Sequence, residues 1–166
     1  MEVFRGIVLI LATLTTGLMA GVFFIYTNAI MRGLRQTDDR TFVGAFQAND
    51  RAIINPLFML CFLGALVFTG LAAALHFGAH DRPVLPWAAA AFVLYLAAVV
   101  ITFAVNVPLN NAIKAEGDPD RIEDLAAVRR RFNEAKWSAW NLVRTLTSLA
   151  AFGCLTGALV QFGALA

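Results

Sequence analysis

Four long apolar runs constrain this chain more than any other feature of its sequence. Each is close to the roughly 20 helical residues that cross the hydrocarbon core of a membrane. The runs cover residues 7–26, 57–75, 87–105 and 145–163. None alternates apolar and polar residues as a barrel strand does, so helices are the expected structure. The sequence predicts an all-α membrane protein, a single domain over residues 1–166 with four transmembrane helices in an up-down-up-down bundle.

Composition supports this prediction. The chain is 60% hydrophobic and only 14% charged, whereas soluble domains carry about 25% charged residues. The first run has one alternative, a cleaved signal peptide with Arg5 as its basic flank and Ala20 before the cut. Its apolar residues continue to Tyr26, well beyond the roughly 7–15 residues of a signal core, which favours a retained helix.

Arginine and lysine fall mainly in the loops over residues 27–55 and 108–137, whereas the opposite side has only Arg5 and Arg82. The positive-inside rule predicts a multi-pass protein of the cell membrane with both of those loops cytoplasmic and both termini outside. The net charge of +2 then reflects topology, and no nucleic-acid-binding surface is expected. Membrane lipid is the expected partner, and a homo-oligomer remains open.

The cysteines and histidines exclude several functions. Cys61 and Cys154 are isolated, and a quinone-linked thiol oxidoreductase would need a vicinal pair. His76 and His80 have a spacing that could place both on one helix face, but Gly78 lies between them and a turn follows. Interface histidines are therefore favoured over a haem or metal site. No metal site and no glycine-rich phosphate loop is predicted.

Polar residues gather at the cytoplasmic ends of the predicted helices. The spacing of Trp137, Asn141 and Arg144 places them on one helix face. Singly, each residue has an ordinary explanation as a helix cap, an interfacial anchor or a snorkelling side chain. Together they indicate a pocket or a polar clasp between helices, because intramembrane polar groups face a cavity or one another. A cavity beside Arg144 would favour the pocket. The candidate site residues are Asn28, Asn55, Asn106, Asn110, Asn111, Trp137, Trp140, Asn141 and Arg144.

The two basic loops have helical patterns of their own. In the first, Phe42, Phe46, Asn49 and Ile53 recur at helical spacing after Asp38 as a cap, with Asp50 and Gln47 placed mostly elsewhere on the wheel. This predicts an amphipathic helix that covers the pocket mouth or anchors at the interface. The second loop breaks at Gly117 and continues as a charged helix with a solvated face.

Four motifs resemble the anthrone oxygenase-like family of small four-helix membrane proteins, formerly a domain of unknown function. They are "FFIYTNAIMRGL", "QANDRAIINPLF", "NVPLNNAI" and "WSAWNLVRT", and the resemblance extends over nearly the whole chain. The family includes fungal enzymes that oxidise anthrones to anthraquinones in polyketide pathways. Many bacterial members have no established activity, so the fold transfers more safely than the substrate.

The resemblance implies a cofactor-independent monooxygenase acting with O₂ on a lipophilic fused-ring aromatic, whose acidic methylene gives an enolate that reduces O₂ directly. In this hypothesis Arg144, Asn141 and Asn106 form the catalytic set. Arg144 stabilises the oxyanion, and the amide of Asn106, Asn110 or Asn141 donates a hydrogen bond to the carbonyl oxygen of the substrate. The other candidates bind the ligand, and Trp137 and Trp140 stack on its rings. Asp50 and Glu134 are the loop candidates for a general base. The alternatives are a carrier or binder of a lipophilic molecule without turnover, and a non-catalytic protein whose Asn/Arg cluster is a structural clasp or docks a partner.

Overall fold

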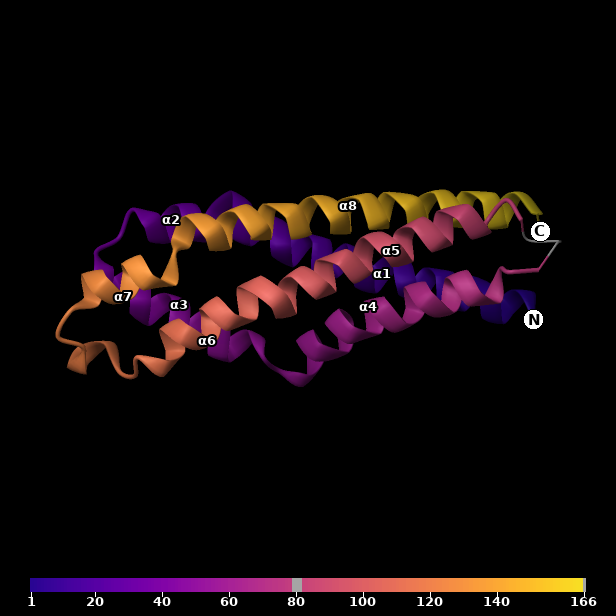
Figure 1. The fold of residues 1–166 in the computed structure, drawn as a ribbon. Helices are drawn as coiled ribbons and strands as arrows, with labels where there is room; N and C mark the ends of the chain where they lie inside the picture. Colours follow the sequence, from indigo (N-terminus) through magenta and orange to yellow (C-terminus); the bar gives the residue numbers. More distant parts are fainter. Residues whose placement is uncertain (79–81, 166) are drawn as a thin grey trace.

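The computed structural model describes residues 1–78 and 82–165, and within these ranges all regular secondary structure is helical, with no strand (Figure 1). The α-helices are α1 (Glu2–Ile25), α2 (Met31–Arg35), α3 (Asp39–Ile53), α4 (Pro56–Leu75), α5 (Leu85–Ile101), α6 (Val107–Ala115), α7 (Leu125–Phe132) and α8 (Glu134–Leu165). Two π-helical segments, η1 (Tyr26–Ile30) and η3 (Thr102–Asn106), continue α1 into α2 and α5 into α6. A short 3₁₀ turn, η4, covers Pro119–Arg121.

Among the described residues, four helical stretches are long and apolar enough to cross a membrane, namely Glu2–Arg35, Pro56–Leu75, Leu85–Ala115 and Leu125–Leu165. Each contains one of the four predicted apolar runs. Their outward faces remain apolar, since Leu60 is 66% exposed, Val93 63% and Val160 66%. A continuous exposed apolar surface of this kind is uncommon on soluble monomers.

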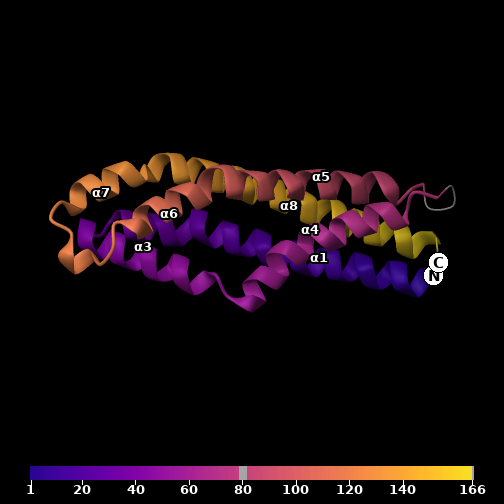
Figure 2. The ribbon, with the colours of Figure 1, turned by 60° about the horizontal axis from the view of Figure 1, so that its bottom comes forward.

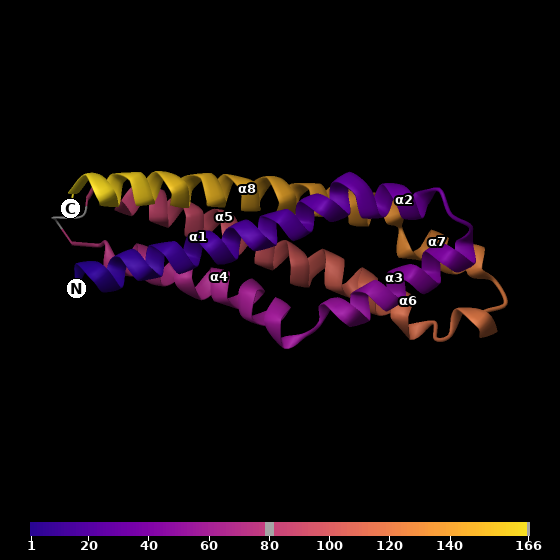
Figure 3. The same ribbon diagram turned by 180° about the vertical axis from the view of Figure 1, so that it is seen from behind.

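The four long helices pack as a bundle. Helix α1 contacts α4 and α8, and α5 contacts the same two helices, so each long helix has two neighbours (Figure 3). Small residues such as Ala12, Ala65, Ala91 and Ala151 are fully buried where these helices meet. Small side chains let helix backbones approach closely. The N- and C-termini lie at the same end of the molecule (Figure 1).

The shorter helices gather at the opposite end, where α3, α6 and α7 lie together (Figure 2). The predicted helix of the first basic loop is present as α3. Its N-cap is Asp38, whose carboxylate accepts hydrogen bonds from the Thr41 backbone N–H at 2.9 Å and from the Thr41 hydroxyl at 2.7 Å. These bonds stabilise the charged form and lower the pKa of Asp38 below its ordinary value.

The buried face of α3 packs on the protein's own helices. Phe42 and Phe46 are buried against Phe132 of α7, with ring centroids 5.7 and 4.5 Å apart. The predicted wheel was wrong in one respect, because Asn49 is exposed whereas Asp50 and Gln47 are buried. The face of α3 that carries Gln47 and Asp50 points inward because α6 and α7 pack against the helix.

The second basic loop bends at two residues with positive φ. Gly117 has φ +84°, and Asn133 has φ 52° in the left-handed region, where it separates α7 from α8. Arg130 and Arg131 of α7 are exposed, as predicted for a solvated face. Arg129 is an exception: its guanidinium lies 4.3 Å above the Phe42 ring and donates to the Thr37 carbonyl oxygen.

His76 lies near the end that holds the termini. His76 is fully buried, with Nδ1 2.7 Å from the Ala72 carbonyl oxygen and its ring edge-on to Phe162. His80 lies outside the described residues. Over the ranges that the structure describes, no group of three His, Cys, Asp or Glu side chains could hold a metal ion.

Candidate functional site

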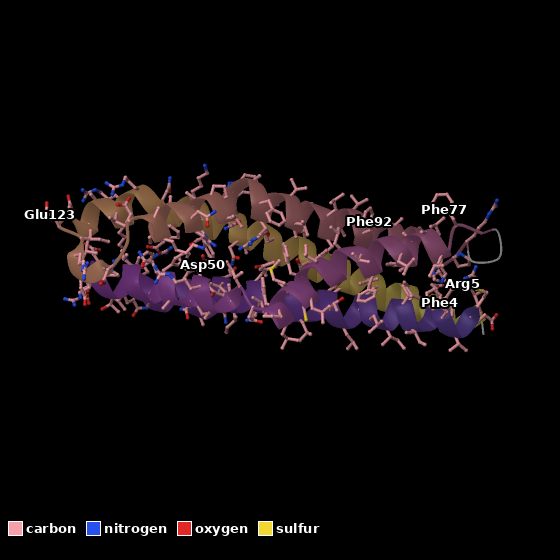
Figure 4. All side chains as sticks on the ribbon, turned by 90° about the horizontal axis from the view of Figure 1, so that it is seen from below. Phe4, Arg5, Asp50, Phe77, Phe92 and Glu123 are labelled. Carbon is pink, nitrogen blue, oxygen red and sulfur yellow. The ribbon has the colours of Figure 1, made fainter. Side chains whose placement is uncertain are left out.

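A cavity of about 250 Å³ lies where α1, α3, α4, α8 and the η3–α6 segment meet. This volume is near the lower end of small-molecule sites, about 300 Å³ and above. Figure 4 shows Asp50 between the ribbons of α3 and α6, far from Arg5 and Phe77 at the terminal end. The wall is mostly aromatic and aliphatic, with a few polar groups. It is formed by Val22, Phe23, Tyr26, Phe46, Asp50, Ile53, Ile54, Phe58, Met59, Phe62, Thr102, Phe103, Val107, Asn110, Trp137, Asn141 and Arg144.

Arg144 is the buried cation of this cavity and is only 6% exposed. Its Nη1 donates to the Thr102 hydroxyl at 3.0 Å, and its Nη2 donates to Asn141 Oδ1 at 2.6 Å. The guanidinium carbon lies 4.4 Å from the Phe23 ring centroid and 5.7 Å from that of Trp137. Among the described residues no carboxylate pairs with it, and its Nε–H has no partner. A buried cation held only by neutral groups attracts negative charge strongly.

Asn141 fixes the position of Arg144. Its amide nitrogen donates to the Phe23 carbonyl oxygen at 3.0 Å and to the Thr27 hydroxyl at 2.7 Å. Both amide protons are therefore used, and the amide oxygen is directed to Arg144. The Phe23 carbonyl also accepts from the Thr27 hydroxyl at 3.1 Å. Segment η1 begins three residues after Phe23, so the widened helix lies directly beside this bond.

The second π-helical segment, η3, positions the other partner of Arg144. Thr102 opens η3, and its hydroxyl donates to the Ala98 carbonyl oxygen at 2.8 Å while accepting from Arg144. Pro108 follows η3; it has no N–H to donate, and its ring crowds the preceding turn. This explains why the helix widens here. π-Helical segments inside α-helices are frequent at functional sites, and here two of them flank one cavity.

A chain of polar contacts runs along another side of the cavity. The Trp137 indole N–H donates to Asn110 Oδ1 at 2.7 Å, and Asn110 Nδ2 donates to Asp50 Oδ1 at 2.6 Å. Asp50 Oδ2 forms an ion pair with Lys114 Nζ at 2.6 Å. Asn106 supports the same tryptophan, because its amide donates to the Trp137 carbonyl oxygen at 3.3 Å. The ring of Trp137 is thus fixed between Arg144 and Asn110.

Aromatic side chains close the cavity on the side of the short helices. The Trp137 ring meets Phe46 edge-on at 5.7 Å and Tyr26 at 5.8 Å. Phe46 comes from α3, the helix predicted either to cover the pocket mouth or to anchor at the interface. In the structure, Phe46, Asp50 and Ile53 of α3 all line the cavity.

The structure brings together some of the sequence-predicted site residues. Arg144, Asn141, Asn110 and Trp137 line the cavity, and Asn106 is buried behind Trp137. The others lie outside the lining: Asn28, Asn55 and Asn111 are exposed, and Trp140 is 38% exposed. Asn55 has a local role, since its Oδ1 accepts from the Phe58 backbone N–H at 3.0 Å as the N-cap of α4.

The sequence predictions did not include Thr102, Tyr26 or the cavity role of Phe46, and they named Asp50 as a loop candidate for a general base without placing it in the cavity. A signal for Asp50 was present, because Phe46, Asp50 and Ile53 are spaced by four and three residues and share a helix face. Thr102 gave no signal, since a threonine within an apolar run ordinarily bonds its own helix.

The fold and the cavity define a class: a small all-helical protein whose four apolar helices suggest a membrane protein, with one enclosed arginine in an aromatic pocket. The family model described as anthrone oxygenase matches residues 58–154, more than half of the chain, and the chain belongs to this family. The match includes Asn110, Trp137, Asn141 and Arg144 but not α1 or α3. Comparisons with curated proteins and with solved structures gave no significant match.

Proposed function

We propose that this protein is a membrane-bound, cofactor-independent monooxygenase that oxidises a lipophilic fused-ring aromatic in the cavity beside Arg144. The observation on which the proposal depends is the enclosed guanidinium of Arg144, which has neutral partners and aromatic walls. A cavity built this way suits a flat aromatic molecule that develops negative charge on one oxygen atom.

The membrane setting follows from the apolar helices. The four candidate spans would cross the bilayer in up-down-up-down order, with their exposed leucines and valines facing lipid. The basic loops over residues 27–55 and 108–137 would lie on the cytoplasmic side. The cavity would then open near the cytoplasmic end of the bundle. A lipophilic substrate could reach it from the membrane without passing through water.

The proposed reaction converts an acidic methylene next to an aromatic ring system into a carbonyl. One atom of O₂ becomes the carbonyl oxygen, and the other leaves as water. Loss of the first methylene proton gives an enolate, which is electron-rich enough to reduce O₂ without a metal or a flavin. The rate of that step depends on how well the enolate oxygen is stabilised.

Arg144 supplies that stabilisation in this proposal. A preformed donor in a site that excludes water costs no reorganisation during the reaction, and removing one such donor typically slows turnover about 10²–10³-fold. Asn141 and Thr102 hold the guanidinium in place, whereas the sequence hypothesis had Asn141 donating to the substrate. Trp137 and Phe23 provide flat surfaces for the rings.

A second candidate is a non-catalytic protein in which the same contacts fasten the helices. Asn141 connects α8 to α1, and Arg144 connects α8 to η3. A clasp needs these bonds but does not need an empty volume of about 250 Å³ beside them. A carrier would have the same cavity without turnover.

Oxygen uptake with a simple anthrone separates these candidates. The purified protein in lipid nanodiscs is compared with a protein-free control, because anthrones oxidise slowly by themselves, and with a folded Arg144→Ala variant. Uptake well above the control, lost in the variant, with ¹⁸O from O₂ in the anthraquinone carbonyl, is the expected result. Uptake equal to the control while the anthrone still binds would support a carrier. Neither uptake nor binding would support the clasp.

A further inference from the structure

We infer that Asp50 is the proton acceptor of the cavity and removes the first proton from the methylene carbon of the substrate. This inference rests on the proposed function and selects between the two carboxylates, Asp50 and Glu134, that the sequence offered as a general base. Asp50 is the sole carboxylate among the described residues that line the cavity. It is 8% exposed, so a bound aromatic molecule would meet it largely out of water.

The contacts of Asp50 leave it able to accept a proton. Its Oδ1 accepts one hydrogen bond from Asn110, and its Oδ2 faces the ammonium group of Lys114. A carboxylate has about four lone-pair positions, so each oxygen retains room for a further donor. Lys114 also compensates the negative charge, which makes an ionised carboxylate tolerable at a buried position.

The other loop carboxylate considered from the sequence is unsuited to this role. Glu134 does not line the cavity, so a substrate bound there would not meet it, and each of its oxygens faces an arginine. Oε1 accepts from Arg35 Nε at 2.6 Å, and Oε2 lies 3.5 Å from Arg129 Nη2. Glu134 therefore fastens the start of α8 to α2 and α7.

The inference assigns Asp50 and Arg144, which line the same cavity, to the two ends of the proposed substrate. In an anthrone the methylene carbon lies across the central ring from the carbonyl oxygen. Asp50 and Arg144 lie on different helices, α3 and α8, and Trp137 and Asn110 come between them in the chain of contacts. A ring system stacked along Trp137 would place its oxygen at Arg144 and its methylene towards Asp50.

One carboxylate is sufficient for all the proton transfers of the proposed reaction. Asp50 takes the first methylene proton as the C–H electron pair moves into the enolate. One electron passes to O₂, and the resulting radical and superoxide combine into a carbon-bound peroxide anion, which takes the proton back from Asp50. Asp50 then removes the second proton from the same carbon as the C=O bond forms and the O–O bond breaks. The departing hydroxide takes that proton and leaves as water.

Methylene hydrogen exchange under anaerobic conditions tests this step apart from the oxygen chemistry. The full chain in nanodiscs is incubated with anthrone in D₂O, and loss of the methylene proton signal is followed by NMR. General-base catalysis typically contributes about 10²–10⁴-fold. We expect wild type to accelerate exchange, Asp50→Asn to lose at least about 10²-fold of that acceleration, and Asp50→Glu to restore part of it.

Asp120→Asn is the matched control, because Asp120 is an exposed carboxylate paired with Arg40 outside the cavity. It should exchange like wild type. Anthrone binding and thermal unfolding of each variant are measured alongside. Wild-type exchange no faster than the protein-free rate overturns the inference whatever the oxygen uptake. The inference is also overturned if Asp50→Asn exchanges as fast as wild type. It is overturned as well if folded Asp50→Glu loses as much of the acceleration as Asp50→Asn does. Accelerated exchange without oxygen uptake would instead refute the proposed oxygenase and leave the base assignment standing.

Discussion

Replacing Arg144 by methionine should separate catalysis from stability. Methionine keeps much of the side-chain length and removes the charge. The change deletes hydrogen bonds to Thr102 and Asn141. Bonds from a charged donor are worth about 1.5–3 kcal/mol each, so roughly 3–6 kcal/mol of favourable interaction is lost. The change also leaves Asn141 Oδ1 without its donor, which costs about 1–3 kcal/mol more.

The opposing term is the desolvation of the guanidinium. Enclosing a cation without a carboxylate costs several kcal/mol, and methionine avoids that cost. Its sulfur would also contact Phe23 and Trp137, where sulfur–aromatic contacts contribute about 0.3–1.5 kcal/mol. The losses, about 4–9 kcal/mol in total, and the gains are of similar size, so the free energy of unfolding should change by less than about 4 kcal/mol. Turnover should fall about 10²–10³-fold.

The assay is reversible unfolding in detergent together with oxygen uptake at saturating anthrone. Arg40→Met is the control, because Arg40 forms an exposed pair with Asp120, and exposed pairs contribute about 0–1 kcal/mol. A loss of more than about 4 kcal/mol of stability in Arg144→Met would refute the reasoning. It would show that Arg144 mainly fastens the helices, as the clasp interpretation requires.

Other regions of the chain give further predictions. Phe46→Ala should destabilise the protein by about 3–5 kcal/mol and widen the cavity, which chemical denaturation and a shift in ligand size preference would detect; unchanged stability would contradict the buried position of the ring. Asn55→Ala should lower the free energy of unfolding by about 0.5–2 kcal/mol because it removes the cap of α4, whereas Asn55→Asp should retain the cap. Equal unfolding curves for wild type and both variants would argue against the cap. The lowered pKa of Asp38 means that its cap is intact at neutral pH and is lost as pH falls through that value. The protection factors for hydrogen exchange at the start of α3, which correct for the intrinsic pH dependence of exchange, should therefore fall at acid pH in wild type and show no such fall in Asp38→Asn.

The sequence was sufficient to predict the helices but not to predict which side chains of each helix line the site. Apolar runs of span length predict helices because a backbone in hydrocarbon must satisfy its own hydrogen bonds. The same reasoning placed Arg144, Asn141 and Trp137 on one face, and all three line the cavity. Asn28 shows the limit of that reasoning. It lies at the correct level of the bundle, but within η1 the helix turns by a different amount per residue, and the side chain is exposed.

The parts of the site that the sequence did not predict depend on tertiary contacts. Asp50 belongs to the cavity because Asn110 and Lys114, about 60 residues later in the chain, meet it from α6. No local pattern contains that pairing. The left-handed Asn133 was equally hidden, because an asparagine inside a charged helical stretch gives only a weak signal for a break.

The two π-helical segments offer a way to change the lining of the cavity with little change in sequence. A π-helical turn holds one residue more than the α-helical turn it replaces, and one residue corresponds to about 100° of rotation. Deleting a single residue within Thr102–Asn106 would leave every span long enough to cross a membrane. It would, however, rotate Asn106 and Asn110 around the helix axis relative to Thr102. Relatives that differ by one-residue gaps at these two places would retain the same outer surface towards lipid while presenting different side chains to the cavity. An alignment gap at η1 or η3 should therefore mark a change of ligand more reliably than substitutions elsewhere in the spans.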